Sequence, residues 1–220
     1  MFKFKELFSW WKEDVLMKTA FENVKSSLKK SADIFSYALK ASLEGSIDED
    51  KIHEMDREIN TLQVDTRRKV LEHLTIKPAQ DIIPSLVWVT IIVDIERIGD
   101  YSKNIGELTH FTPHEIKGVA YITELNNIGI KLESLFKNTL DALIYENPEI
   151  AKIVATECTE INYQCENGIN SIAEASELLP REIVFYTLFF RYLKRVSSHL
   201  RNISTSILNP FDRIGYKPQS

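Results

Sequence analysis

The sequence contains little that would turn or cross-link the chain. Glycine and proline occur only seven times each in 220 residues, so turns are few and the elements between them are long, which favours helices. The two cysteines, Cys158 and Cys165, lie seven residues apart. In a helix this spacing is about 10 Å, which is too far for a disulfide. We expect reduced, half-buried thiols that serve as packing residues.

A basic excess and a long hydrophobic run are also absent. The net charge of −5 argues against a nucleic-acid-binding protein, which normally carries a basic face. The longest apolar runs, at 86–93 and 183–190, are much shorter than the ~20 residues that span a bilayer. The first residues, MFKFKELFSWWKEDV, are interrupted by charges and contain no signal-peptide core. We therefore expect a cytoplasmic protein, either soluble or peripheral at the inner face of the membrane.

Helical signals fill most of the chain. Ile52, Met55, Ile59 and Leu62 follow the spacing of one buried helical stripe. Prolines 78, 113, 148 and 180 suit first-turn positions, and Gly45 suits a helix end. The string Thr112-Pro113-His114-Glu115 resembles an N-cap with a capping-box glutamate. These signals predict helices over 19–44, 48–75, 78–108, 113–146, 148–178 and 180–208.

The two halves of the chain share short strings in the same order. Ala38-Leu39 recurs as Ala142-Leu143, Glu58-Ile59-Asn60 as Glu160-Ile161-Asn162, and Asn104-Ile105 as Asn202-Ile203. We predict an all-α fold of six long helices, arranged as two pseudo-repeated three-helix bundles. The expected parts are an aromatic N-terminal segment (1–17), a first repeat (18–110), a degenerate second repeat (111–208) and a C-terminal tail (209–220).

An acidic stretch directly follows the apolar run at 86–93. Asp94, Glu96 and Asp100 lie within seven residues, with Gly99 among them. At helical spacing Glu96 and Asp100 stack one turn apart on one flank, and Gly99 removes side-chain bulk beside them. Asp94 falls on the opposite flank, where Arg97 is expected to pair with it.

The preceding helix has a polar strip on the matching flank, formed by Asp56, Asn60 and Gln63. A short link makes the two helices antiparallel, so we expect this strip to face Glu96 and Asp100. Crowded carboxylates repel one another. A divalent cation would remove that conflict, and oxygen ligands suit a hard metal such as Mg²⁺, Mn²⁺ or iron.

The alternative to a metal site is a solvated face on which Arg57 and Lys103 balance the acids. The spacing of the residues leaves both interpretations open.

The same residues resemble the PhoU family, bacterial and archaeal regulators of phosphate transport. The resemblance rests on KPAQD (77–81), DIERIGD (94–100), DREINTLQVDTRRKVLEHL (56–74) and RYLKRVSSHLRNI (191–203), and covers roughly residues 19–208. It implies the two-repeat helical fold, and iron or zinc bound by an E-x-x-x-D motif. Carried over by position, the metal ligands are Glu96 and Asp100, with Asp56 from the facing helix. Gln63 stands where relatives often have glutamate.

The second repeat departs from this pattern. Lys194 stands in place of the glutamate and Ser198 in place of the aspartate, while Cys158 and Cys165 take the facing strip. Since a lysine ammonium repels a cation, we expect no metal with oxygen ligands there. A site built from the cysteines and His199 is disfavoured, because thiolates seven residues apart are too distant to chelate readily. Core packing is the better interpretation.

Nothing in the sequence predicts an enzyme. It has no glycine-rich phosphate loop and no visible nucleophile–base pair. A di-iron bundle needs Glu-x-x-His on two helices, and such a string occurs once, at Glu107 to His110, near a helix end. His110 and His114 are expected in a solvent-exposed link between the repeats.

The resemblance implies a non-enzymatic regulator of phosphate transport and phosphate-responsive signalling. Its partners would be a phosphate transporter subunit, a sensor kinase or both, and family members often form homodimers. A metal-storing or metal-sensing helical bundle is the alternative.

The N-terminal segment is a separate candidate for contact with a partner. Phe4, Leu7, Phe8, Trp11 and Val15 share one helical face. We expect this face to dock on the protein's own bundle. Contact with a partner or with the membrane is the alternative.

Overall fold

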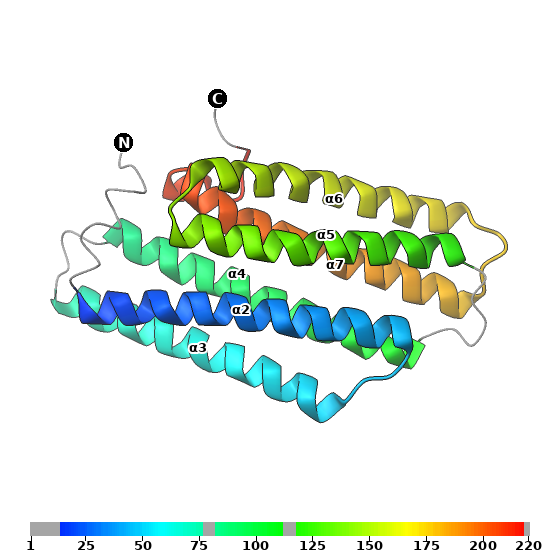
Figure 1. Cartoon of the computed structure of the whole chain (residues 1–220), viewed down its shortest axis with the longest axis horizontal. Coiled ribbons are helices and arrows are strands. Elements are labelled where there is room, and N and C mark those ends of the chain that lie inside the picture. Colours follow the sequence, from blue (N-terminus) through cyan, green and yellow to red (C-terminus); the bar gives the residue numbers. More distant parts are fainter. Residues whose placement is uncertain (1–13, 77–81, 112–117, 218–220) are drawn as a thin grey trace.

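The fold is all-α, as predicted (Figure 1). The computed structural model describes residues 14–76, 82–111 and 118–217. Within these ranges it contains six long helices and no strand. The helices are α2 (Val15–Glu44), α3 (Glu49–Ile76), α4 (Ile82–Glu107), α5 (Val119–Ile144), α6 (Pro148–Glu174) and α7 (Pro180–Leu208). Two 3-10 turns, η2 (Leu108–Phe111) and η3 (Phe211–Arg213), follow α4 and α7.

Local sequence signals set several helix ends. Asp14 caps α2 by accepting hydrogen bonds from the backbone of Leu16 and Met17. Gly45 ends the same helix in the left-handed conformation, at φ 74°. Pro148 and Pro180 are the first residues of α6 and α7, as predicted. The predicted start signals at Pro78 and at 112–115 lie outside the described residues.

The helices pack in two groups of three. Helices α2, α3 and α4 contact one another, as do α5, α6 and α7. The groups meet mainly through α4 against α7 and α2 against α5. Figure 1 shows the helices running along the length of an elongated bundle. The repeat boundaries at 18–110 and 111–208 stay a prediction.

The interior is apolar and rich in large side chains. Its largest fully buried members, which fill both groups, include Trp88, Phe35, Phe185, Tyr186, Phe189 and Phe190. The hydrophobic residues form one continuous core, so the two groups pack as one body. No helix in the described ranges is long and apolar enough to cross a bilayer.

Candidate functional site: the carboxylate seam of helices α3 and α4

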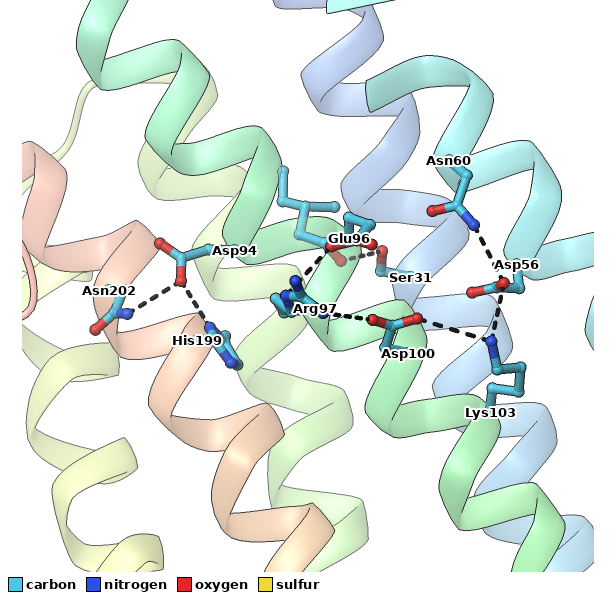
Figure 2. Close-up of polar contacts among 11 residues, drawn as sticks. Ser31, Asp56, Asn60, Asp94, Glu96, Arg97, Asp100, Lys103, His199 and Asn202 are labelled. Atoms are coloured by element: carbon cyan, nitrogen blue, oxygen red, sulfur yellow. Dashed lines mark hydrogen bonds and ion pairs between the residues drawn. The ribbon is translucent and has the colours of Figure 1, made fainter. Parts of the chain in front are cut away.

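The predicted acidic residues do meet between α3 and α4 (Figure 2). Asp56 comes from α3, and Glu96 and Asp100 come from α4. The Lys103 ammonium joins the two helices, since its Nζ lies 3.1 Å from Asp56 Oδ2 and 3.7 Å from Asp100 Oδ1. We call these four residues the carboxylate seam.

Gly99 allows the close approach of the two helices. A Cβ atom at this position would lie 3.0 Å from Ile59 Cδ1 and 3.8 Å from Asp56 Oδ1. The first distance is tighter than ordinary van der Waals contact, so the end of the Ile59 side chain would have to shift by a few tenths of an ångström if residue 99 had a Cβ atom. The glycine therefore lets Ile59 pack directly against the backbone of α4, one turn from Asp56.

The polar strip of α3 lies where the sequence placed it. Asp56 is only 7% exposed, and Gln63 is also buried. Asn60 is half-buried and donates a hydrogen bond from Nδ2 to Asp56 Oδ2, at 3.2 Å. The expected facing of Asp56 and Asn60 toward Glu96 and Asp100 is therefore present in the fold (Figure 2).

The seam carries closely spaced charges of both signs. Burial raises the pKa of Glu96, and the charges of Asp100 and Asp56 raise it further, while Arg97 and Arg67 partly oppose them. Arg97 pairs with Asp100 at 3.0 Å and with Glu96 at 3.6 Å. The acids still repel one another after this compensation.

Lys103 supplies a cation from within the chain. Burial alone would lower the pKa of Lys103, but the hydrogen bond to Asp56 and the charges of Asp56, Asp100 and Glu107 outweigh it and raise that pKa. The ammonium is therefore held firmly in its charged form. In the solvated-face interpretation, Lys103 balances the charge of the acids, and its ion pairs with Asp56 and Asp100 agree with that role. Arg57 makes no ion pair within the described ranges, and Arg97 pairs with the acids of α4 instead.

One feature of the seam favours a metal ion, and two features oppose it. Asp56 Oδ1 is buried and accepts no hydrogen bond from any described residue, so one carboxylate oxygen is free to ligate. In the ranges that the structure covers, however, no three His, Cys, Asp or Glu side chains are grouped closely enough to hold a metal ion. The Lys103 ammonium lies between two of the predicted ligands. A metal at Glu96, Asp100 and Asp56 stays a prediction, and it would have to displace Lys103.

Replacing Glu96 with glutamine is expected to stabilise the protein at pH 7, by about 0.5 kcal/mol. The raised pKa means that the folded state favours the protonated acid. Ionised Glu96 therefore costs stability above its folded-state pKa, and the cost vanishes as pH falls below the usual 4.5. Urea unfolding of Glu96→Gln and wild type between pH 7 and pH 4 measures this.

The exposed Glu133→Gln on α5 is the matched control, since it removes a carboxylate that faces solvent. If Glu96→Gln is less stable than wild type in metal-free buffer, then the seam stabilises the ionised Glu96 carboxylate, and the expectation is wrong.

Asp94 has partners that the sequence did not predict. The expected pair with Arg97 is wrong, because Arg97 contacts Glu96 and Asp100. Asp94 is buried against α7, where its Oδ1 lies 2.6 Å from His199 Nδ1 and accepts a hydrogen bond from Asn202 Nδ2 at 3.0 Å (Figure 2). Tyr101 stacks on the His199 ring. These contacts join the two helix groups.

The corresponding positions of α7 carry Lys194 and Ser198 in place of the two acids of α4. Lys194 pairs with Glu166, and Asn162 Nδ2 donates to Ser198 Oγ at 3.2 Å. Cys158 and Cys165 are fully buried free thiols. Burial raises the pKa of each to about 12. The cysteines pack in the core, as predicted, although they are more deeply buried than expected.

We expect both thiols to resist labelling while the chain is folded. Thiolate is the reactive form, and a pKa of about 12 leaves almost none at pH 8. Ellman's reagent should react more than about a hundredfold slower with folded than with urea-unfolded protein. Unfolding should release two thiols per chain. Rapid labelling of one thiol in native buffer would show that its part of α6 opens locally.

Comparison with known proteins identifies the fold and a PhoU domain in the first half of the chain. Residues 19–109, which include all of α3 and α4, match the PhoU domain. A phosphate-specific transport system accessory protein PhoU homolog from Synechocystis sp. is 24% identical over 165 residues, 71% of each chain. The crystal structure of PhoU from Pseudomonas aeruginosa superposes with a TM-score of 0.80 at 17% identity, covering 89% of this chain and 96% of that one.

A second solved structure has the same fold. The phosphate transport system regulatory protein PhoU from Streptococcus pneumoniae gives a TM-score of 0.73 at 15% identity, over 93% of this chain and 94% of that one. The two structures agree with the all-α architecture described above. Residues 19–109 match the PhoU domain, and the chain has the same fold as these two PhoU structures.

Proposed function

We propose that this protein regulates phosphate transport and phosphate-responsive signalling through contacts with other proteins, without catalysing a reaction. The PhoU domain over residues 19–109 carries this proposal, supported by relatives named as accessory proteins of the phosphate transport system. A rigid helical bundle with exposed helix faces suits the binding of partner proteins. The proposed partners are a subunit of the phosphate transporter and a sensor kinase, met at the inner face of the membrane, and the protein itself is proposed to form a homodimer.

The test is deletion of the gene followed by measurement in phosphate-replete cells. We expect uptake of radioactive phosphate and expression of phosphate-responsive genes to rise, and both to return when the full chain is supplied. Unchanged uptake and unchanged expression after deletion would overturn the proposal. Affinity capture from membranes of the same cells should recover transporter subunits with the full chain.

A metal-binding bundle is the second candidate. It is supported by the buried Asp56 Oδ1 without a hydrogen bond and by the raised pKa of Glu96. Asp56, Glu96 and Asp100 would hold the ion, which would neutralise their mutual repulsion. The test is metal analysis of protein purified without chelator. Stoichiometric metal that is lost in the Glu96→Ala, Asp100→Ala double variant supports this candidate, and metal-free protein that still regulates uptake rejects it.

A further inference from the structure

Helix α3 ends and α4 begins at the same end of the bundle (Figure 1), and both helices carry exposed aliphatic residues between the carboxylate seam and that end. On α3, Val64 and Leu71 are 53% and 64% exposed, and on α4, Ile82 and Leu86 are 49% and 40% exposed. We call these four residues the α3–α4 aliphatic face. Contiguous exposed aliphatic side chains on a soluble bundle commonly mark a site of interaction.

Helical spacing places these residues on the same side of each helix as the seam. On α4, Ile82 and Glu96 are separated by four helical turns, and Leu86 and Asp100 likewise, with half-buried Val89 and Val93 between them. On α3, Val64 follows Asn60 by four residues, and Leu71 follows Val64 by seven. Each stripe therefore begins with the polar residues of the seam and continues as aliphatic side chains.

The register of the two helices brings the stripes level with each other. Gly99 faces Ile59, and Gly106 faces Ile52, as the close contacts of their Cβ positions show. Because α3 and α4 are antiparallel, moving twelve residues along each helix from the pair Ile59 and Gly99 places Leu71 opposite Val87, next to Leu86. Leu71 and Leu86 are therefore level with each other across the two helices, and Val64 lies two turns from Leu71, nearer the seam.

Basic residues line the α3 side of this surface. Arg57, Arg67 and Arg68 are exposed and form no ion pair with any described residue. Arg67 and Arg68 lie between Val64 and Leu71, and the charge of Arg67 reaches far enough to lower the pKa of Glu96. The chain has a net charge of −5, so three guanidinium groups without an ion pair to a described residue, beside exposed aliphatic residues, are unusual. They indicate a surface that is complementary to an acidic partner.

We propose that the α3–α4 aliphatic face binds an amphipathic helix of another protein, with aliphatic residues on one side and carboxylates along its flank. The aliphatic stripe of that helix packs on Val64, Leu71 and Leu86, and its carboxylates pair with Arg67 and Arg68. This inference rests on the proposed function, because it gives a place and a chemistry to the contacts with other proteins.

Other occupants fit the charges less well. A second copy docked through the same face would bring the arginines of both copies together, since a two-fold contact is self-complementary. Residues 1–13 of this chain carry Lys3, Lys5 and Lys12 against only Glu6 and Glu13, so they match the basic side poorly.

The test measures binding of a synthetic helical peptide to the full chain by fluorescence anisotropy. The probe has 18 residues, leucines at i, i+4, i+7 and i+11, and glutamates on one flank, and a second peptide has lysines in place of the glutamates. We expect Leu71→Glu, Leu86→Glu to weaken binding of the glutamate peptide at least tenfold. The matched control Ile130→Glu, Ile153→Glu changes two exposed aliphatic residues on α5 and α6, at 53% and 51%, and should leave binding unchanged.

Reversing the charges of Arg67 and Arg68 tests the proposed pairing with carboxylates directly. Arg67→Glu, Arg68→Glu should weaken the glutamate peptide and strengthen the lysine peptide. The inference is overturned if wild type binds no glutamate peptide, if it prefers the lysine peptide, or if Leu71→Glu, Leu86→Glu binds as wild type does. Three further results would overturn it, each by showing another occupant. Leu71→Glu, Leu86→Glu could abolish binding to phosphatidylserine vesicles or dissociate a dimer. The chain could also bind the glutamate peptide only after removal of residues 1–13.

The cellular assay separates this inference from the proposed function. If deletion of the gene raises phosphate uptake and the Leu71→Glu, Leu86→Glu chain restores control fully, the regulator role stands and the docking face is wrong. If deletion changes nothing, the regulator role fails, whereas the peptide measurements still decide the docking face.

Discussion

Replacement of Asp94 with alanine is expected to lower the free energy of unfolding by about 3 kcal/mol. Asp94 is buried between α4 and α7 and holds both His199 and Asn202 through one carboxylate oxygen. Its removal leaves two half-buried polar side chains from α7 without their acceptor, and breaks the contact at a buried position between the two helices. The effect is large because the contact joins the two helix groups. Urea unfolding at pH 7, followed by circular dichroism, measures the loss.

Two controls separate this network from a general effect of losing a carboxylate. Asp94→Asn keeps an acceptor oxygen and should lose less stability than Asp94→Ala. Asp100→Ala removes a more exposed acid of the same helix and should cost less than 1 kcal/mol. A double-mutant cycle of Asp94→Ala with His199→Ala should show a coupling above about 1 kcal/mol. Additive effects of the two changes would contradict the network.

Replacement of Lys103 with methionine is expected to cost about 2 kcal/mol at pH 7, because the buried Asp56 loses its cation beside Asp100 and Glu96. Methionine keeps the length of the side chain, so packing is largely retained. The pKa of Lys103 is raised in the folded state. Its contribution is therefore complete below the usual 10.5 and is lost as pH rises through the folded-state pKa. Wild type and variant should converge in stability at strongly alkaline pH.

The same variant tests whether the seam accepts a metal ion. With the ammonium gone, Asp56, Glu96 and Asp100 present only oxygen ligands. If the metal-binding candidate is right, Mn²⁺ should bind Lys103→Met at least tenfold more tightly than wild type and should restore most of its lost stability. The exposed Lys131→Met on α5 is the matched control. Unchanged stability of Lys103→Met at pH 7 would show that the lysine does not hold the acids together.

Much of the seam was predictable from local spacing. The interval of four residues puts Glu96 and Asp100 on one flank of α4, and the polar strip of α3 has the same rotational position. A short link makes the helices antiparallel, so the two flanks had to face each other. Gly99 marked the point of close approach, since a Cβ atom at this position would lie only 3.0 Å from Ile59 Cδ1. Which basic residue pairs with these acids was less predictable, because Arg57, Arg97 and Lys103 are all close to one of the acids in sequence.

The sequence by itself determined the helical class, the lengths of the elements, several of their ends and the side of each helix that faces the core. These properties depend on hydrogen bonds and side-chain periodicity within a few residues of each position. Only the tertiary structure decided that Lys103 reaches Asp56, 47 residues away, and that Asp94 is held by His199, 105 residues away. A helical period gives the direction of a side chain but not its distance from another helix. That distance follows from packing of the whole core, and the strength of an ion pair or hydrogen bond depends on it.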